Sequence, residues 1–100
     1  MSGAGYRARV GLYARDSEKE LINVRMHGIS FLEAETVVMS ALASTLPDLE
    51  HSELEERYRT IGWSNLGRLL VVVTSEGGPR PRIISAWRAT KRDRRAYERR

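Results

Sequence analysis

Few residues of this sequence can transfer a proton near neutral pH. The chain has two histidines, His27 and His51, and no cysteine, so imidazoles and carboxylates are the available general acids and bases. Arginines are abundant, and Arg57, Arg68 and Arg82 each stand at the start of an expected strand. Arginine holds phosphate through two parallel hydrogen bonds and keeps its charge at physiological pH. These residue types are suited to binding a phosphate group and to moving a proton beside it.

Each of these residues also has a purely structural interpretation. His27 precedes Gly28 at the expected end of a helix, where backbone carbonyls favour a charged imidazole but where a histidine can simply cap them. The arginines can instead pair with the acidic segment 53–56 at the margin of a sheet. His51 lies in an acidic loop, but two histidines without a fixed ligand spacing make a poor metal site. We therefore expect neither a metal nor another cofactor.

Positive charge is concentrated at the C-terminal end of the sequence. The net charge is +4, and residues 80–100 contain nine Lys and Arg against two acidic residues. A basic end on a nearly neutral body suggests a polyanionic or acidic partner, and a solvated, charged helix is the alternative. The positions that we expect to contact an anionic partner are Arg25, Arg88, Lys91, Arg94 and Arg95.

The apolar pattern predicts two helices in the first half of the chain. Residues 16–17 supply an N-cap and a glycine supplies a stop for a helix over residues 17–26. Ser30 and Glu33 form an S-x-x-E capping box for a second helix over residues 31–43. The expected buried positions are Leu21, Ile22 and Val24 in the first helix and Ala34, Val38 and Leu42 in the second.

Three strands and a last helix are predicted in the second half. Residues 57–63 alternate, residues 68–74 form an apolar run typical of a central strand, and residues 82–87 follow a Gly-Gly-Pro turn. A capping box at residues 90–93 begins the last helix, and residues 7–13 give a weak strand signal. The order (β)ααβββα predicts an α+β fold, with helices packed on an antiparallel sheet. Its expected core residues in the strands are Leu70, Val72 and Ile83.

The length of 100 residues is that of one domain, so we expect residues 1–100 to fold together, with residues 1–5 mobile. The longest apolar run, residues 69–73, is far too short to cross a bilayer. The absence of cysteine agrees with a reducing compartment. We therefore expect a cytoplasmic protein with no membrane association.

Several stretches, in their order and spacing, resemble the BrnT family of ribonuclease toxins. The resemblance covers roughly residues 13–98 and depends on the ordered set rather than on one chemical signature. The stretches are residues 23–34 (NVRMHGISFLEA), 47–48 (PD), 51–52 (HS), 55–58 (EERY), 61–62 (IG), 67–72 (GRLLVV), 82–86 (RIISA), 89–90 (AT) and 94–98 (RRAYE).

This resemblance implies a compact fold similar to the RelE-type toxins. It also implies a ribonuclease of a type II toxin–antitoxin system that slows growth by blocking translation. The implied partners are an RNA substrate and a BrnA-like antitoxin of the ribbon-helix-helix type. The antitoxin would mask the toxin and carry it to operator DNA, which the toxin would reach only through that complex.

The same resemblance gives the candidate residues roles in metal-independent RNA cleavage. The reaction must remove the 2′-OH proton, stabilise charge at phosphorus and supply a proton to the 5′-oxygen. We expect Arg57, Arg68 and Arg82 to hold the phosphate, His27 to carry the proton, and the other basic positions to grip the RNA backbone. The aromatic candidates for base stacking are Tyr58, Trp63 and Trp87, with a core or interface role as the alternative for at least two of them.

Two positions depart from the pattern of the family. The family usually has Lys-His-Gly where this chain has Met26 before His27, and Ser-Ala-Arg where this chain has Trp87. Arg88 follows one residue later, but side chains alternate faces along a strand, so it should not replace an arginine at Trp87. Both changes remove a cation. The alternative function is therefore a catalytically weakened homologue that binds the antitoxin and acts with it as a co-repressor at the operator.

Overall fold

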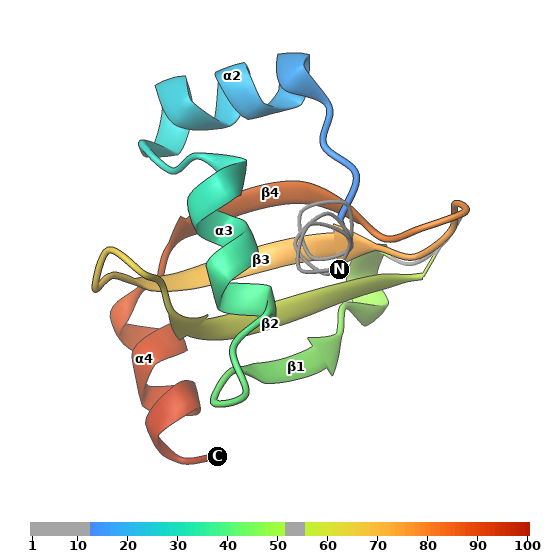
Figure 1. Cartoon of the computed structure of the whole chain (residues 1–100). Coiled ribbons are helices and arrows are strands. Elements are labelled where there is room, and N and C mark those ends of the chain that lie inside the picture. The colour runs from blue at the N-terminus through green and yellow to red at the C-terminus, as the bar shows by residue number, and fades with distance from the viewer. Residues whose placement is uncertain (1–12, 52–55) are drawn as a thin grey trace, which may run out of the picture.

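The computed structural model describes residues 13–51 and 56–100. Residues 1–5 and most of the expected strand over residues 7–13 lie outside this part. The described residues form an antiparallel sheet in the order β1-β2-β3-β4 (Figure 1). The strands are β1 (Ser44–Pro47), β2 (Arg57–Trp63), β3 (Leu69–Ser75) and β4 (Arg82–Arg88). The helices are α2 (Ser17–His27), α3 (Phe31–Val38), a short 3-10 helix η1 (Leu49–His51) and α4 (Lys91–Glu98).

The α+β class is confirmed, and the predicted element order is wrong in one place. The second helix ends at Val38 rather than at residue 43, and the chain then forms β1, a strand that the sequence did not predict. Gly62 of β2 permits this path, because a Cβ atom there would lie 3.0 Å from the Cβ of Ala43. The proline of β1 is tolerated because β1 is an edge strand.

The core lies between α3 and the sheet, and α3 crosses β4, β3 and β2 (Figure 1). Most predicted core positions are confirmed, because the apolar stripe of α3 and one face of β3 are both buried. In the second predicted helix the exception is Leu42, which is 72% exposed since the helix has already ended before it. The buried cluster comprises Ile29, Phe31, Ala34, Val37, Leu70, Val72, Ile83 and Ala86, with Tyr13 and Val38 packed against it.

The opposite face of the sheet carries cations. Val72 belongs to the core cluster, whereas its neighbour in β3, Val73, points to the other side, as alternation along a strand requires. Val73 lies between Arg59 of β2 and Ser85 of β4 in the strand register. We call this side the arginine face and define it by Arg57, Arg59, Val73, Ser85 and Trp87.

Helix α2 is attached to the edge strand β4 through a polar side chain rather than an apolar one. The amide of buried Asn23 pairs with Ala86 of β4, because its Nδ2 donates to the Ala86 carbonyl (2.9 Å) and its Oδ1 accepts from the Ala86 N–H (3.1 Å). The same Nδ2 also donates to the carbonyl of Ile29 (2.9 Å). The predicted burial of the apolar residues of this helix is therefore wrong, and Leu21, Ile22 and Val24 are exposed.

A carboxylate is buried in α3 without a hydrogen bond. The Oε2 atom of Glu35 is inaccessible to solvent and makes no hydrogen bond to any described residue. Burial raises the pKa of Glu35, and the nearby charge of Arg15 lowers it by less. Because the folded-state pKa is raised, the contribution of Glu35 to stability is fully present at acidic pH and is lost as the pH rises through that pKa.

We therefore expect Glu35→Gln to increase the melting temperature at pH 7.5 by a few degrees. The amide removes the cost of burying a charge, and this gain should disappear near pH 4, where the wild-type carboxyl is protonated. Thermal melts of both proteins across this pH range measure the difference. An equal difference at both ends of the range would show that the charge of Glu35 does not matter.

Candidate active site

A cleft of about 190 Å³ lies over the arginine face. Strand β2 contributes two cations, because alternate residues of a strand point to the same side. In β4 a register shift opposite Val73 and Thr74 leaves Ile84 without a partner in β3, so that both Ile84 and Ser85 reach the cleft. The lining residues are Asp48, Arg57, Arg59, Val73, Ile84, Ser85 and Trp87.

Arg59 has the properties of an anion-binding residue. Its side chain is half-buried, and its Nε atom is shielded from solvent without a hydrogen bond to any described residue. A buried donor without an acceptor is costly unless a ligand supplies one. Asp48 is also buried at the cleft, and its N–H donates to the carbonyl of Arg57 (2.8 Å), which ties the loop after β1 to β2. An oxyanion in the cleft would satisfy the donor of Arg59.

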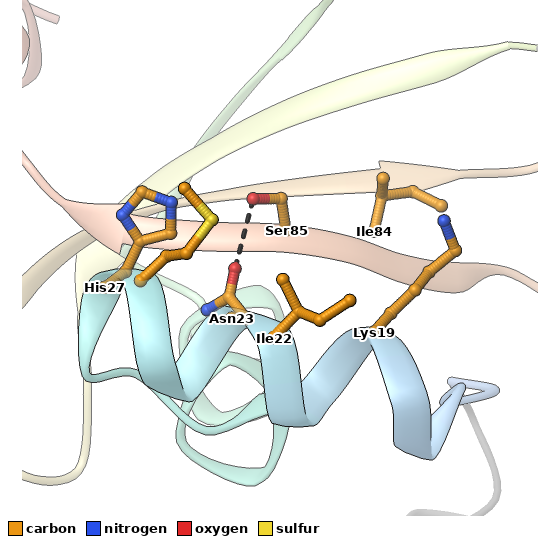
Figure 2. A pocket seen from close by; sticks show the side chains of 7 residues that line it. Lys19, Ile22, Asn23, His27, Ile84 and Ser85 are labelled. Carbon is orange, nitrogen blue, oxygen red and sulfur yellow. Dashed lines mark hydrogen bonds between the residues drawn. The ribbon is translucent and has the colours of Figure 1, made fainter.

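His27 lies beside this cleft rather than among its lining residues. It is the last residue of α2, and its ring centroid is 6.3 Å from that of Trp87, with the two planes tilted by 48°. A second hollow, a groove of about 210 Å³ between α2 and β4, shares Ile84 and Ser85 with the cleft (Figure 2). The structure therefore brings His27, Arg57 and Trp87 to two adjoining hollows that share Ile84 and Ser85.

Arg68 is held elsewhere. Its guanidinium makes a two-pronged ion pair with buried Glu33, through Nε to Oε2 (3.0 Å) and through Nη2 to Oε1, and Nη2 also donates to the carbonyl of Gly28 (3.3 Å). The hydrogen bond from Arg68 holds the pKa of Glu33 below its usual range, against the opposing effect of burial. Arg68 lines neither hollow. Its charge instead neutralises Glu33 where α2, α3 and β3 meet.

This ion pair changes the predicted capping box. The hydroxyl of Ser30 accepts from the N–H of Glu33 (3.0 Å), as predicted for the start of α3. The Glu33 carboxylate is used by Arg68 and by the hydroxyl of Ser64, which donates to it at 2.6 Å, rather than by the backbone of Ser30. Only one half of the box is therefore present.

The other predicted cations lie around the site rather than in it. Arg82 of β4 is exposed, and Ser75 of β3 lies between it and Arg57 of β2 in the strand register. Arg82 therefore extends the arginine face at the end of the sheet. Arg88 lies opposite Leu70 of the core, and its charge lowers the pKa of Glu33, so it is on the α3 side. The expectation that Arg88 does not take the place of Trp87 is confirmed. Arg25 is exposed and lines neither hollow.

Helix α4 presents its cations at the other end of the sheet. It docks through Tyr97, whose hydroxyl donates to the carbonyl of Leu42 (3.2 Å). Arg94 lies over the ring of Trp63 at 5.2 Å and is 4.0 Å from Glu98, so part of its charge is already used. The side chains of α4 that remain exposed include Lys91 and Arg95.

One of the three aromatic candidates for stacking lines the cleft. Trp87 does so, whereas Trp63 packs under Arg94 and Tyr58 donates its hydroxyl to Glu56 (3.3 Å). Sequence reasoning missed Arg59 and Asp48 as site residues. Arg59 could have been predicted, because it follows Arg57 by two residues in a strand and therefore points to the same side of the sheet. No local feature of the sequence indicates Asp48.

Two further properties concern metals and membranes. Within residues 13–51 and 56–100, no group of three or more His, Asp and Glu side chains is placed to hold a metal ion. In the same part of the chain, no helix is long and apolar enough to cross a membrane.

A small α+β fold with arginines and an indole around a cleft on its sheet, and a histidine at the end of a neighbouring helix, belongs to a class suited to act on nucleic acid. The chain belongs to the BrnT family: the family described as "Ribonuclease toxin, BrnT, of type II toxin-antitoxin system" matches residues 16–93. The crystal structure of the Brucella abortus ribonuclease toxin BrnT superposes with a TM-score of 0.61 and 22% sequence identity. The match covers 79% of this chain and 96% of that one, and it supports the fold. No curated protein matches the sequence.

Proposed function

We propose that this chain is an endoribonuclease toxin that cleaves RNA in the arginine cleft without a metal ion. The observation that carries the proposal is the buried Nε donor of Arg59, which has no partner among the described residues and lies in a cleft beside Arg57 and Trp87 in a chain of the BrnT family. Arginines at this place supply the positive charge that a phosphate needs.

In the proposed reaction, the 2′-oxygen attacks the adjacent phosphorus and the bond to the 5′-oxygen breaks. Arg57 and Arg59 hold the two non-bridging oxygens and stabilise the negative charge that develops on them. His27, in the groove beside the cleft, accepts the proton that leaves the 2′-OH, and water supplies the proton that the departing 5′-oxygen takes up. Trp87 stacks on a base next to the cleaved bond. Arg68 acts as a positioning residue, since it anchors the carbonyl that follows His27.

The cations around the cleft fit the other parts of the proposal. Exposed Arg82 extends the arginine face, and exposed Lys91 and Arg95 on α4 can contact backbone phosphates of the same RNA. Cleavage of RNA in the cytoplasm would block translation and slow growth. Control would come from a ribbon-helix-helix antitoxin, which would also carry the toxin to operator DNA.

The purified chain should cut single-stranded RNA in the presence of a metal chelator and leave the matching DNA intact. The products should carry 2′,3′-cyclic phosphate and 5′-OH ends, because the 2′-oxygen is the nucleophile. A single 2′-deoxy substitution should block cleavage at that position only. Cleavage that stops with the chelator, or that tolerates the 2′-deoxy nucleotide, would contradict this mechanism.

Two observations favour a second candidate, a weakened toxin that mainly serves the antitoxin complex. Trp87 lines the cleft and Met26 lines the adjoining groove, at the two positions where the resemblance to the family leads us to expect cations. A cation at a developing oxyanion lowers the barrier by about 3–4 kcal/mol, or two to three decades of rate.

On this second candidate, the paired change Met26→Lys with Trp87→Arg should increase the rate of RNA cleavage at least about tenfold and increase growth arrest. Antitoxin affinity should stay within about tenfold of that of the wild type. The measurements are single-turnover cleavage and growth after induction. Strong wild-type toxicity with no gain in the variant would show that neither position touches the reaction, and would remove the case for the weakened toxin.

A further inference from the structure

The groove between α2 and β4 is apolar on both walls. Ile22 and Met26 of α2 line one side and Ile84 of β4 lines the other. Ile22 is 53% exposed and Met26 is 71% exposed, although large apolar side chains are usually covered. Figure 2 shows Lys19 and Ile22 reaching from α2 toward Ile84, with His27 at the end of the helix.

We propose that this groove binds one unstacked base of the RNA strand whose neighbouring phosphate lies in the arginine cleft. The inference rests on the proposed function and adds to it a base-binding subsite with Ile22 and Met26 as its wall. These residues would then take part in determining which base stands beside the cleaved bond.

Continuity with the cleft is the first support. Ile84 and Ser85 line both hollows, so the groove adjoins the phosphate site across β4. His27 lines the groove and its ring lies 6.3 Å from that of Trp87, which lines the cleft. The proton carrier therefore stands between the two subsites.

Size and charge are the second support. The groove measures about 210 Å³, which is below the roughly 300–1,000 Å³ of sites for larger ligands, so it suits a single ring system. Its lining includes the cation Lys19, whose charge favours an anionic ligand.

The polar groups of the groove are mostly used within the protein, so a bound base would contact the apolar walls with the faces of its ring. The amide of Asn23 is used up, because it donates to two carbonyls and accepts from the Ala86 N–H and the Ser85 hydroxyl (3.2 Å). Ser85 keeps lone pairs that can accept from a base edge. Affinity should then depend on apolar contact with Ile22 and Met26.

The test uses a 2′-O-methyl RNA of about eight nucleotides, which binds but cannot be cleaved. An abasic site is moved along this strand, and affinity is measured by fluorescence anisotropy. One abasic position should weaken binding to the wild type about tenfold, and that position should have no effect in Ile22→Ser. Met26→Ser should show the same loss of coupling.

Leu21→Ser is the matched control, since Leu21 is also 53% exposed on α2 but does not line the groove. It should keep the abasic effect of the wild type. If binding depends on Arg59 but no abasic position is coupled to Ile22 or Met26, the base subsite is refuted while the proposed function stands. If Ile22→Ser weakens only antitoxin binding, the groove takes a protein side chain and the subsite is likewise refuted. If the wild type binds no RNA, the proposed function itself fails.

Discussion

Replacing Arg59 with alanine is expected to slow RNA cleavage about 100- to 1,000-fold at saturating RNA. The reason is that a donor aimed at the developing oxyanion acts mainly in the transition state. The fold should tolerate the change, because the Arg59 Nε makes no hydrogen bond to any described residue and none is lost. Single-turnover kinetics, with the melting temperature as a check on folding, measure this effect.

Arg95→Ala is the control for this prediction. Arg95 is exposed on α4 and does not line the cleft, so its charge contributes to binding along the RNA backbone only. We expect a weaker affinity and a smaller salt dependence of binding, with an unchanged rate at saturation. If both variants raise KM and neither lowers kcat, the arginines of the cleft are binding residues and the catalytic assignment is wrong.

The second large effect concerns stability. Arg68→Met removes the partner of Glu33, whose side chain is 3% exposed, and leaves a buried charge unpaired. Removing one partner of such a pair is strongly destabilising, and the 27% exposure of the Arg68 side chain moderates the loss. Urea denaturation at pH 7.5 measures the loss of unfolding free energy.

The pH dependence separates the charge of Glu33 from the packing of Arg68. The pKa of Glu33 is lowered, chiefly by the hydrogen bond from Arg68, so its stabilising contribution is present above the usual pKa of glutamate. That contribution is lost as the pH falls through the folded-state pKa, and the gap between wild type and variant should narrow below about pH 4.3.

Glu33→Gln added to Arg68→Met should recover most of the loss at pH 7.5. The amide carries no charge, and its oxygen still accepts from the Ser64 hydroxyl. A double variant as unstable as Arg68→Met alone would show that the arginine acts through packing and through its bond to Gly28 rather than by neutralising Glu33.

Strong local signals explain what could be predicted from the sequence. Strand β2 was predicted with its observed bounds, because its alternation is clear and a turn with a glycine follows it. The capping box of Thr90 and Asp93 likewise marked the start of α4. Strand β1 was missed because it has four residues, is mostly exposed and follows directly on an apolar pattern of helical spacing.

Long-range pairing explains most of what could not be predicted. Asn23 holds α2 on β4 through a hydrogen bond to Ala86, which lies 63 residues later in the sequence. Because this bond attaches the helix, its apolar side chains can remain exposed. Glu33 pairs with Arg68, which lies 35 residues later in the sequence, and this pair removes a predicted phosphate ligand from the site. In the site, strand alternation correctly predicted that Arg88 does not take the place of Trp87, whereas only the fold shows that Arg59 has a buried donor without a partner among the described residues.

The most direct test of the central claim, that RNA occupies the arginine cleft, uses the two tryptophans of the chain. Their indole N–H signals can be resolved by NMR and assigned with Trp63→Phe. On titration with an uncleavable 2′-O-methyl RNA, the signal of Trp87 should shift and saturate, because its ring lines the cleft. The signal of Trp63, which lies under Arg94 at the α4 end, should move much less. Saturable RNA binding that leaves the Trp87 signal unmoved would place the RNA elsewhere and contradict the claim.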